Sequence, residues 1–177
     1  MRLVYAIIIL VSLVVIGSSL YHVYDNLGGF EPVEVYKLEP IKRTMVGKQF
    51  KTRYTDKVIE EQFVKSRELI ASNQIDGELA AVTYLQDSLA GNEIDQFVGI
   101  VLKEDMAEIP VDFDVREFES KTRYVVFLSM HPLVRPKAEQ LESMLHAKAQ
   151  EDGFELRDYF FEIHYQDNSM SLEGWVK

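Results

Sequence analysis

The pattern of hydrophobic positions divides the chain into an apolar N-terminal segment and a longer region where hydrophobic and polar residues alternate. Residues 3–20 contain no charged side chain, and about 20 apolar residues are enough to cross the hydrocarbon core of a bilayer as a helix. Tyr21 and Tyr24 follow, where interfacial aromatic residues are common. Residues 1–22 are therefore predicted to be a transmembrane anchor, and residues 23–32, which are polar and contain glycine, a linker.

The N-terminal segment has two other interpretations. One is a cleaved signal peptide, for which residues 17–19 supply small side chains near a cleavage point, although the hydrophobic run is longer than usual. The other is a buried core helix, which is disfavoured because the segment is apolar on all sides. Arg2 precedes the apolar run. By the positive-inside rule, this favours a single-pass membrane protein with its domain on the extracytoplasmic side.

The remaining region, residues 33–177, contains the same order of predicted elements twice, in repeats at about 33–103 and 111–177. A shift of 80 residues without a gap aligns Arg43 with Arg123, and a shift of 75 aligns residues 97–101 with 172–176. Each repeat has period-2 segments typical of strands, an amphipathic helical segment and a closing hairpin. The predicted strands are 33–38, 43–54, 79–85, 96–102, 111–118, 122–130, 155–165 and 170–176.

Local signals place the two helices between these strands. Asp56 is predicted to be the N-cap of the first helix, which ends near Asn73. Pro136 is predicted at the first position of the second helix, and Gly153 just after its end. We therefore expect an α+β fold, in which two pseudo-symmetric β-α-β-β repeats form an antiparallel sheet with two helices, preceded by a single N-terminal transmembrane helix.

Charge and composition exclude several classes of function. Arg2 is the only charged residue before Asp25, so the rest of the chain has 18 basic and 29 acidic residues and a net charge of −11. Such a surface repels phosphate backbones, and nucleic-acid binding is not expected. The chain has no cysteine, and its four histidines lack the spacing of metal ligands. We predict neither a metal nor a cofactor, since no Gly-rich phosphate loop is present either.

Glu162 is the candidate for the chemistry of the domain. It interrupts the apolar run of residues 159–163, on the strand face that it shares with Phe160 and His164, and the 80-residue shift places Val82 at its position in the first repeat. A carboxylate within a sheet is costly to bury unless it is paired. Either Glu162 points to solvent, or it is a buried acid that recognises a cationic or hydrogen-bonding ligand or acts as a general acid–base.

Aromatic residues are the candidates for the walls of a cleft between the repeats. Tyr84, Tyr124, Phe160 and Trp175 are predicted to line it, with His164 assisting Glu162. The alternative is that most of these aromatic residues belong to the packed core and that His164 is an ordinary polar side chain.

This pattern resembles the GyrI-like domain, a fold also found as the effector-binding module of multidrug-responsive transcription regulators. The duplicated unit and the closing strand at residues 160–167 carry the resemblance. It implies a ligand cavity with a glutamate at its base, which Glu162 matches. Tyr84 matches a tyrosine at the end of the first copy's strand, whereas His164 stands where the family has tyrosine. The anchor makes the chain similar to a membrane-anchored branch that includes an animal ER-phagy receptor.

The sequence therefore predicts a membrane-tethered domain that binds a small apolar or cationic organic molecule between two repeats, near Glu162. Two alternatives stay open. Some GyrI-like proteins resemble hydrolases of electrophilic small molecules, and Glu162 would then be the general acid–base. The domain would otherwise be a membrane-anchored adaptor for an unknown protein partner. Whether the chain is an enzyme is left open by the sequence.

Overall fold

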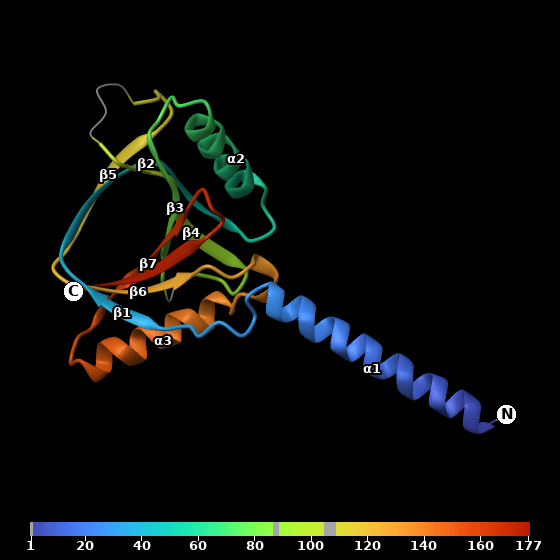
Figure 1. Ribbon diagram of the computed structural model, residues 1–177. Helices are drawn as coiled ribbons and strands as arrows, with labels where there is room; N and C mark the ends of the chain where they lie inside the picture. Colours follow the sequence, from blue (N-terminus) through green and yellow to red (C-terminus); the bar gives the residue numbers. More distant parts are fainter. Residues whose placement is uncertain (1, 87–88, 105–108) are drawn as a thin grey trace.

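A long N-terminal helix projects from a compact α+β domain (Figure 1). The computed structural model describes residues 2–86, 89–104 and 109–177. Helix α1 spans Arg2–Asn26. Within the described chain it is the one helix long and apolar enough to cross a membrane, and no part of Ile9–Asn26 is buried. Because the side chains of this window are exposed, the structure does not support a buried core helix.

The domain is built on one antiparallel sheet with the strand order β1-β6-β8-β7-β3-β4-β2-β5. Its strands are β1 Val35–Leu38, β2 Ile41–Arg53, β3 Gly77–Tyr84, β4 Glu93–Leu102, β5 Asp114–Ser120, β6 Arg123–Leu128, β7 Leu156–His164 and β8 Met170–Val176. The helices are α2 Val58–Ala71 and α3 Ala138–Glu151, with a short 3₁₀ helix, η1, at Pro132–Val134.

The strand order is symmetric about the β7–β3 pair at the centre of the sheet. Exchanging β1 with β5, β2 with β6, β3 with β7 and β4 with β8 reproduces the same order, so the two repeats are related by a pseudo-two-fold axis. Each repeat also lends its first strand to the other half, because β1 pairs with β6 and β5 pairs with β2. The predicted fold, in which two pseudo-symmetric β-α-β-β repeats form an antiparallel sheet with two helices, is thus confirmed.

The two helices cover one face of the sheet, which we call the helix face. Helix α3 packs on a core that includes Tyr124, Phe160 and Leu172, and α2 lies over Val46 and Ile100. The opposite, inner face carries a third core of eight buried residues: Met45, Ala80, Val82, Phe97, Phe118, Phe161, Ile163 and Trp175. No helix contributes to this third core, so the curled sheet buries its inner side chains against one another (Figure 1).

Both helices begin later than the sequence predicts. Asp56 is not the N-cap of α2, since the helix starts at Val58 and the Asp56 carboxylate accepts a hydrogen bond from the Thr52 hydroxyl instead. Pro136 is not the first residue of α3, which starts at Ala138. The predicted end of α3 is confirmed, because Gly153 follows the helix with a positive φ of 78°.

Residues that the 80-residue shift aligns point to the same face of the sheet in only part of the fold. Arg43 and Arg123 both point to the inner face, where they meet the same carboxylate. Val82 lies on the inner face, however, whereas Glu162 lies on the helix face. The register of β7 is irregular at residues 156–160, and one extra residue turns all following side chains to the other face. Val82 is therefore not the structural counterpart of Glu162.

Candidate functional site

The sheet separates the six predicted site residues into two groups. Glu162, His164, Phe160 and Tyr124 lie on the helix face, whereas Tyr84 and Trp175 lie on the inner face. Because the sheet stands between them, these two groups do not line one common cleft.

Glu162 and His164 form a half-buried pair on the helix face of β7. Alternation along the strand places both side chains on the same side, and the Glu162 Oε1 to His164 Nε2 distance is 2.7 Å. About a third of each side chain is exposed, at 30% and 33%. The Phe63 ring of α2 packs edge-on against His164 at 6.0 Å between ring centroids. The pair is thus held in one geometry while staying accessible to solvent.

A second carboxylate lies near this pair, on helix α3. The pKa of Glu142 is raised, first by burial and then by the negative charges of Glu139 and Glu162. The Glu142 carboxylate is therefore close enough to Glu162 to interact with it electrostatically. Across the described residues, no group of histidine and acidic side chains is arranged to hold a metal ion.

Two of the predicted residues are core aromatics beneath α3. Tyr124 and Phe160 are fully buried with Leu141 and Leu145. The Tyr124 hydroxyl donates a 2.8 Å hydrogen bond to Asp152. Burial, followed by this hydrogen bond, raises the pKa of Tyr124 to about 12. These two side chains pack in the core beneath α3.

A groove lies beside the Glu162–His164 pair and is lined by both repeats. We call it the inter-repeat groove; its volume is about 710 Å³. The first repeat contributes Arg67, Ile70, Ala71, Asn73, Glu78 and Leu79, and the second contributes Pro132, Arg135, His164, Tyr165, Gln166, Asn168 and Ser169. His164 is the predicted site residue that reaches this groove. The other lining residues come from the end of α2 and the turn after it, the start of β3, η1 and the residue that follows it, and the loop after β7, so no single periodic pattern in the sequence links them.

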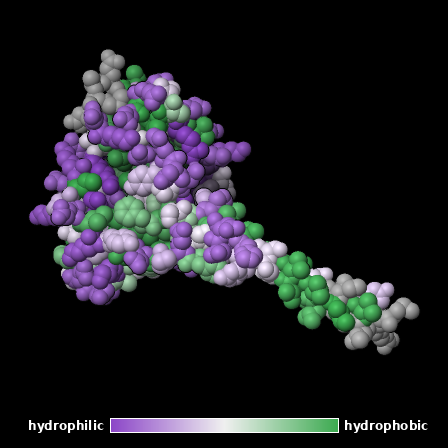
Figure 2. Space-filling model, viewed as in Figure 1, coloured by the Kyte–Doolittle hydropathy of each residue, from purple (hydrophilic) through white to green (hydrophobic). Residues whose placement is uncertain are grey.

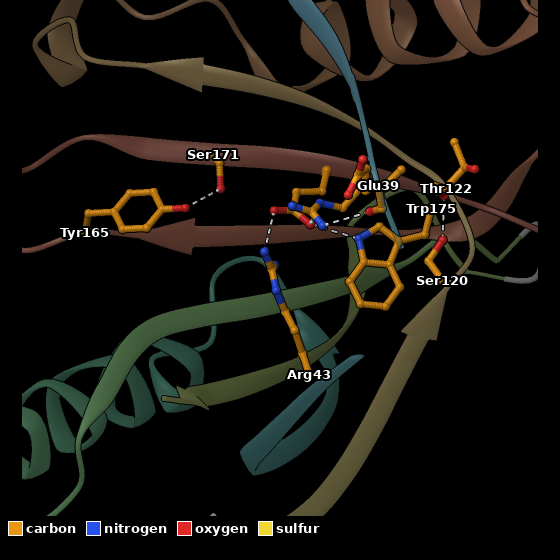
Figure 3. A network of polar contacts seen from close by, with 9 residues as sticks. Glu39, Arg43, Ser120, Thr122, Tyr165, Ser171 and Trp175 are labelled. Carbon is orange, nitrogen blue, oxygen red and sulfur yellow. Dashed lines mark hydrogen bonds and ion pairs between the residues drawn. The ribbon is translucent and has the colours of Figure 1, made fainter. Parts of the chain in front are cut away.

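The inner face carries a different polar centre, built around Glu173 of β8 (Figure 3). The Glu173 side chain is only 1% exposed, yet it accepts hydrogen bonds from Arg43 Nη2 at 2.8 Å and from Trp175 Nε1 at 2.9 Å. Arg43 bonds to Oε1 of Glu173, and Arg123 Nε lies 3.6 Å from Oε2, the oxygen that accepts the hydrogen bond from Trp175. The Trp175 indole stacks on Phe161 with an interplanar angle of 6°. One buried acid thus balances two largely buried guanidinium groups.

Sequence reasoning missed this centre, although one signal for it was present. Arg43 and Arg123 occupy the same position in the two repeats, so a two-fold axis brings both toward one point. Tyr84 belongs to a neighbouring network, in which its hydroxyl accepts a 3.1 Å hydrogen bond from Arg116. With Phe161 and Trp175 filling the space between these networks, the inner face is a packed polar and aromatic core.

Comparison with solved structures finds the same fold in proteins of very low sequence identity. SAV2435 bound to tetraphenylphosphonium is 11% identical, with a TM-score of 0.51 over 82% of this chain and 94% of that one. The EcmrR C-terminal domain is 12% identical, with a TM-score of 0.52 over 82% and 97%. A conserved protein from Listeria innocua is 10% identical, with a TM-score of 0.53 over 82% and 92%.

The chain has the fold of these domains. One of these neighbours, SAV2435, is bound to the small molecule tetraphenylphosphonium. No protein-family model matches the chain, and no curated protein matches it. At identities near 11%, the likeness establishes the arrangement of strands and helices and leaves the residues of the site to be argued from this chain alone.

Proposed function

We propose that the protein is a membrane-tethered domain of the anchored GyrI-like branch, which binds a small organic molecule in the inter-repeat groove. The observation that carries this proposal is the position of the groove, where both repeats meet beside the Glu162–His164 pair. Its volume of about 710 Å³ lies within the usual range of small-molecule pockets, about 300–1,000 Å³.

The lining of the groove suits a ligand with an apolar body and a polar or cationic group. Ile70, Ala71 and Leu79 offer apolar contact, and Glu78 and His164 offer hydrogen bonds. The net charge of −11 outside the N-terminal segment attracts cations over long distances. SAV2435, a protein of the same fold, has been seen with the lipophilic cation tetraphenylphosphonium, which makes this compound a reasonable first probe.

Calorimetric titration with tetraphenylphosphonium tests the proposal. We expect Glu162→Gln to weaken binding about tenfold, or about 1.4 kcal/mol, because it removes the negative charge that positions His164. Glu151→Gln is the matched control, since it removes one carboxylate from an exposed position of α3 that does not line the groove. Equal affinities of wild type and Glu162→Gln would remove Glu162 from the site, and no heat with any variant would reject this ligand class.

A second candidate function, hydrolysis, is favoured by the contact between Glu162 and His164. A carboxylate 2.7 Å from an imidazole nitrogen fixes the orientation of that ring, as general acid–base catalysis requires. Turnover of strained electrophiles such as epoxides, lost in Glu162→Gln, would support this activity. Binding without turnover would favour the non-catalytic function.

The anchor is proposed to cross the membrane once, with residues 33–177 on the extracytoplasmic side. Helix α1 is apolar and unburied over Ile9–Asn26, and Arg2 is the charge that precedes it. When protease is added to sealed vesicles whose cytoplasmic face points outward, the domain should stay intact. Rapid digestion would show that the domain lies on the cytoplasmic side instead. If mass spectrometry showed that the mature chain begins near residue 20, the N-terminal segment would be a cleaved signal peptide.

A further inference from the structure

The end of α1 is fixed to the domain by a structured turn rather than by a loose linker. The Leu27 carbonyl accepts a 2.9 Å hydrogen bond from the His131 backbone N–H, and the Glu31 carboxylate accepts one of 2.7 Å from the Ser129 hydroxyl. Gly28, whose φ is 79°, allows the chain to turn here. These contacts determine which surface of the domain lies next to the membrane if α1 is inserted.

That surface carries exposed apolar side chains. Leu133, at the centre of η1, is 82% exposed, and Phe30 is 56% exposed. Phe30 packs on Tyr21 and Tyr24 of α1, with ring centroids 5.2 and 4.9 Å apart. Figure 2 shows hydrophobic surface along α1 and again on the domain where the helix joins it. Leaving a leucine in water forgoes about 1.5–3 kcal/mol of transfer free energy, so an apolar environment would stabilise this surface.

The charge of the adjoining loop differs from that of the rest of the domain. Residues 129–137, which we call the junction loop, contain no acidic residue but include Arg135 and Lys137. The Arg135 guanidinium donates hydrogen bonds to the Met130 and Asn168 carbonyls. The loop therefore combines exposed apolar residues with basic ones in an otherwise acidic protein. This combination is typical of surfaces that rest on lipid headgroups.

The length of α1 places the junction loop at the depth of the headgroups. Val23 is the last aliphatic residue before the first acidic one, Asp25. Leu27 lies four residues further, or about 6 Å along the axis at 1.5 Å per residue. The headgroup layer on each side of a bilayer is about 5–7 Å thick. His131, bonded to Leu27, and Leu133 beside it thus lie at the level of that layer.

We infer that the junction loop and the neighbouring rings of Tyr21, Tyr24 and Phe30 form a membrane-seating surface. Leu133 and these rings are embedded in the interface of a bilayer rich in neutral, zwitterionic lipids. The rest of the domain is acidic and is repelled by anionic headgroups, so a neutral lipid surface is favoured. This inference rests on the proposed insertion of α1. One consequence concerns the ligand: Pro132 and Arg135 belong to the junction loop and also line the inter-repeat groove, so the groove opens close to the lipid.

The absence of cysteine from the chain allows a direct test by site-directed spin labelling. Leu133→Cys and Val111→Cys are made separately in the full chain, labelled and reconstituted in phosphatidylcholine vesicles. Val111 is the matched control, because it is fully exposed and precedes β5 at the end of the sheet away from α1 (Figure 1). Collisions of each label with oxygen, which concentrates in lipid, and with a water-soluble nickel chelate are then compared.

We expect the ratio of oxygen to nickel collisions to be several-fold higher for the label at position 133 than at position 111. Flotation of the vesicles checks the insertion of α1 independently. Protein that floats while both labels have the same, water-like ratio overturns the seating surface and leaves the proposed anchor standing. Protein that fails to float overturns both. Neither result bears on the titration with tetraphenylphosphonium, which tests the groove separately.

Discussion

At the scale of single residues, the acid that the fold buries most completely is Glu173. Its carboxylate balances Arg43 and Arg123 on the inner face. Removing one partner of a buried ion pair costs about 3–5 kcal/mol, because it leaves charge unpaired in a low-dielectric environment. Glu173→Gln is therefore expected to lower the free energy of unfolding by about that amount.

Urea titration in detergent, followed by circular dichroism, measures this loss. Glu162→Gln is the comparison, because its side chain is 30% exposed and exposed ion pairs contribute at most about 1 kcal/mol. Equal losses for the two variants would show that the network around Glu173 is not a buried ion pair in solution.

Tyr124 gives the domain a predictable response to alkaline pH. Burial raises its pKa to about 12, above the value of about 10 for an unfolded tyrosine. The folded state thus holds this proton more tightly than the unfolded state. Its contribution to stability is complete below pH 10 and declines as the pH rises toward 12. In urea titrations between pH 9 and 12, the free energy of unfolding of Tyr124→Phe should fall less steeply with pH than that of the wild type. An identical dependence on pH would contradict the raised pKa of Tyr124.

The sequence predicts which side chains share one face of a strand better than it predicts the residues that those side chains contact. Period-2 alternation correctly placed Phe160, Glu162 and His164 on one face of β7. It does not tell which face is covered by helices, because that depends on the whole sheet. The contact between Arg43 and Glu173 joins residues 130 positions apart, and no local pattern predicts it. The ligand-binding roles assigned to the six candidate residues stay predictions.

At the scale of elements, the strands follow the hydrophobic pattern more closely than the helices do. Strand β8 has the predicted bounds, Met170–Val176. Helix α2 does not bury the residues that its sequence favours. The helical spacing of Ile59, Phe63 and Ile70 favours an apolar face, but these residues are only partly buried, and the buried positions are Gln62 and Ser66. The exact rotation of a helix on a sheet follows from packing that the sequence alone does not specify.

This difference predicts unequal stability of the two helices. Helix α3 buries Leu141, Leu145 and Ala149 against the sheet, whereas α2 buries two polar residues joined by a long 3.4 Å contact. Apolar burial supplies most of the free energy that attaches a helix. Amide hydrogen exchange should therefore be faster in α2 than in α3 under native conditions. Leu145→Ala should reduce the difference, at a cost of about 2–5 kcal/mol, and slower exchange in α2 would contradict this account.

At the scale of the whole molecule, the duplication could be predicted but the interlocking could not. The repeated order of elements implies a pseudo-two-fold axis, which the strand order confirms. The exchange of β1 and β5 between the halves depends on pairing between strands far apart in the sequence. Because of this exchange, neither repeat completes its half of the sheet alone, and the inter-repeat groove exists only in the assembled domain.

The sheet also divides the molecule into two sides with different roles, and two substitutions should separate them. Trp175→Phe keeps the ring beside Phe161 but removes the N–H donor to Glu173, which should cost about 1–3 kcal/mol of stability. Binding of tetraphenylphosphonium should be unchanged, since the groove lies on the other face. Ala71→Trp fills the groove from an exposed position and should abolish binding, with stability within about 0.5 kcal/mol of wild type. If Trp175→Phe abolished binding and Ala71→Trp did not, the ligand would belong to the inner face, and the packing of Phe161 on Trp175 would have to open to admit it.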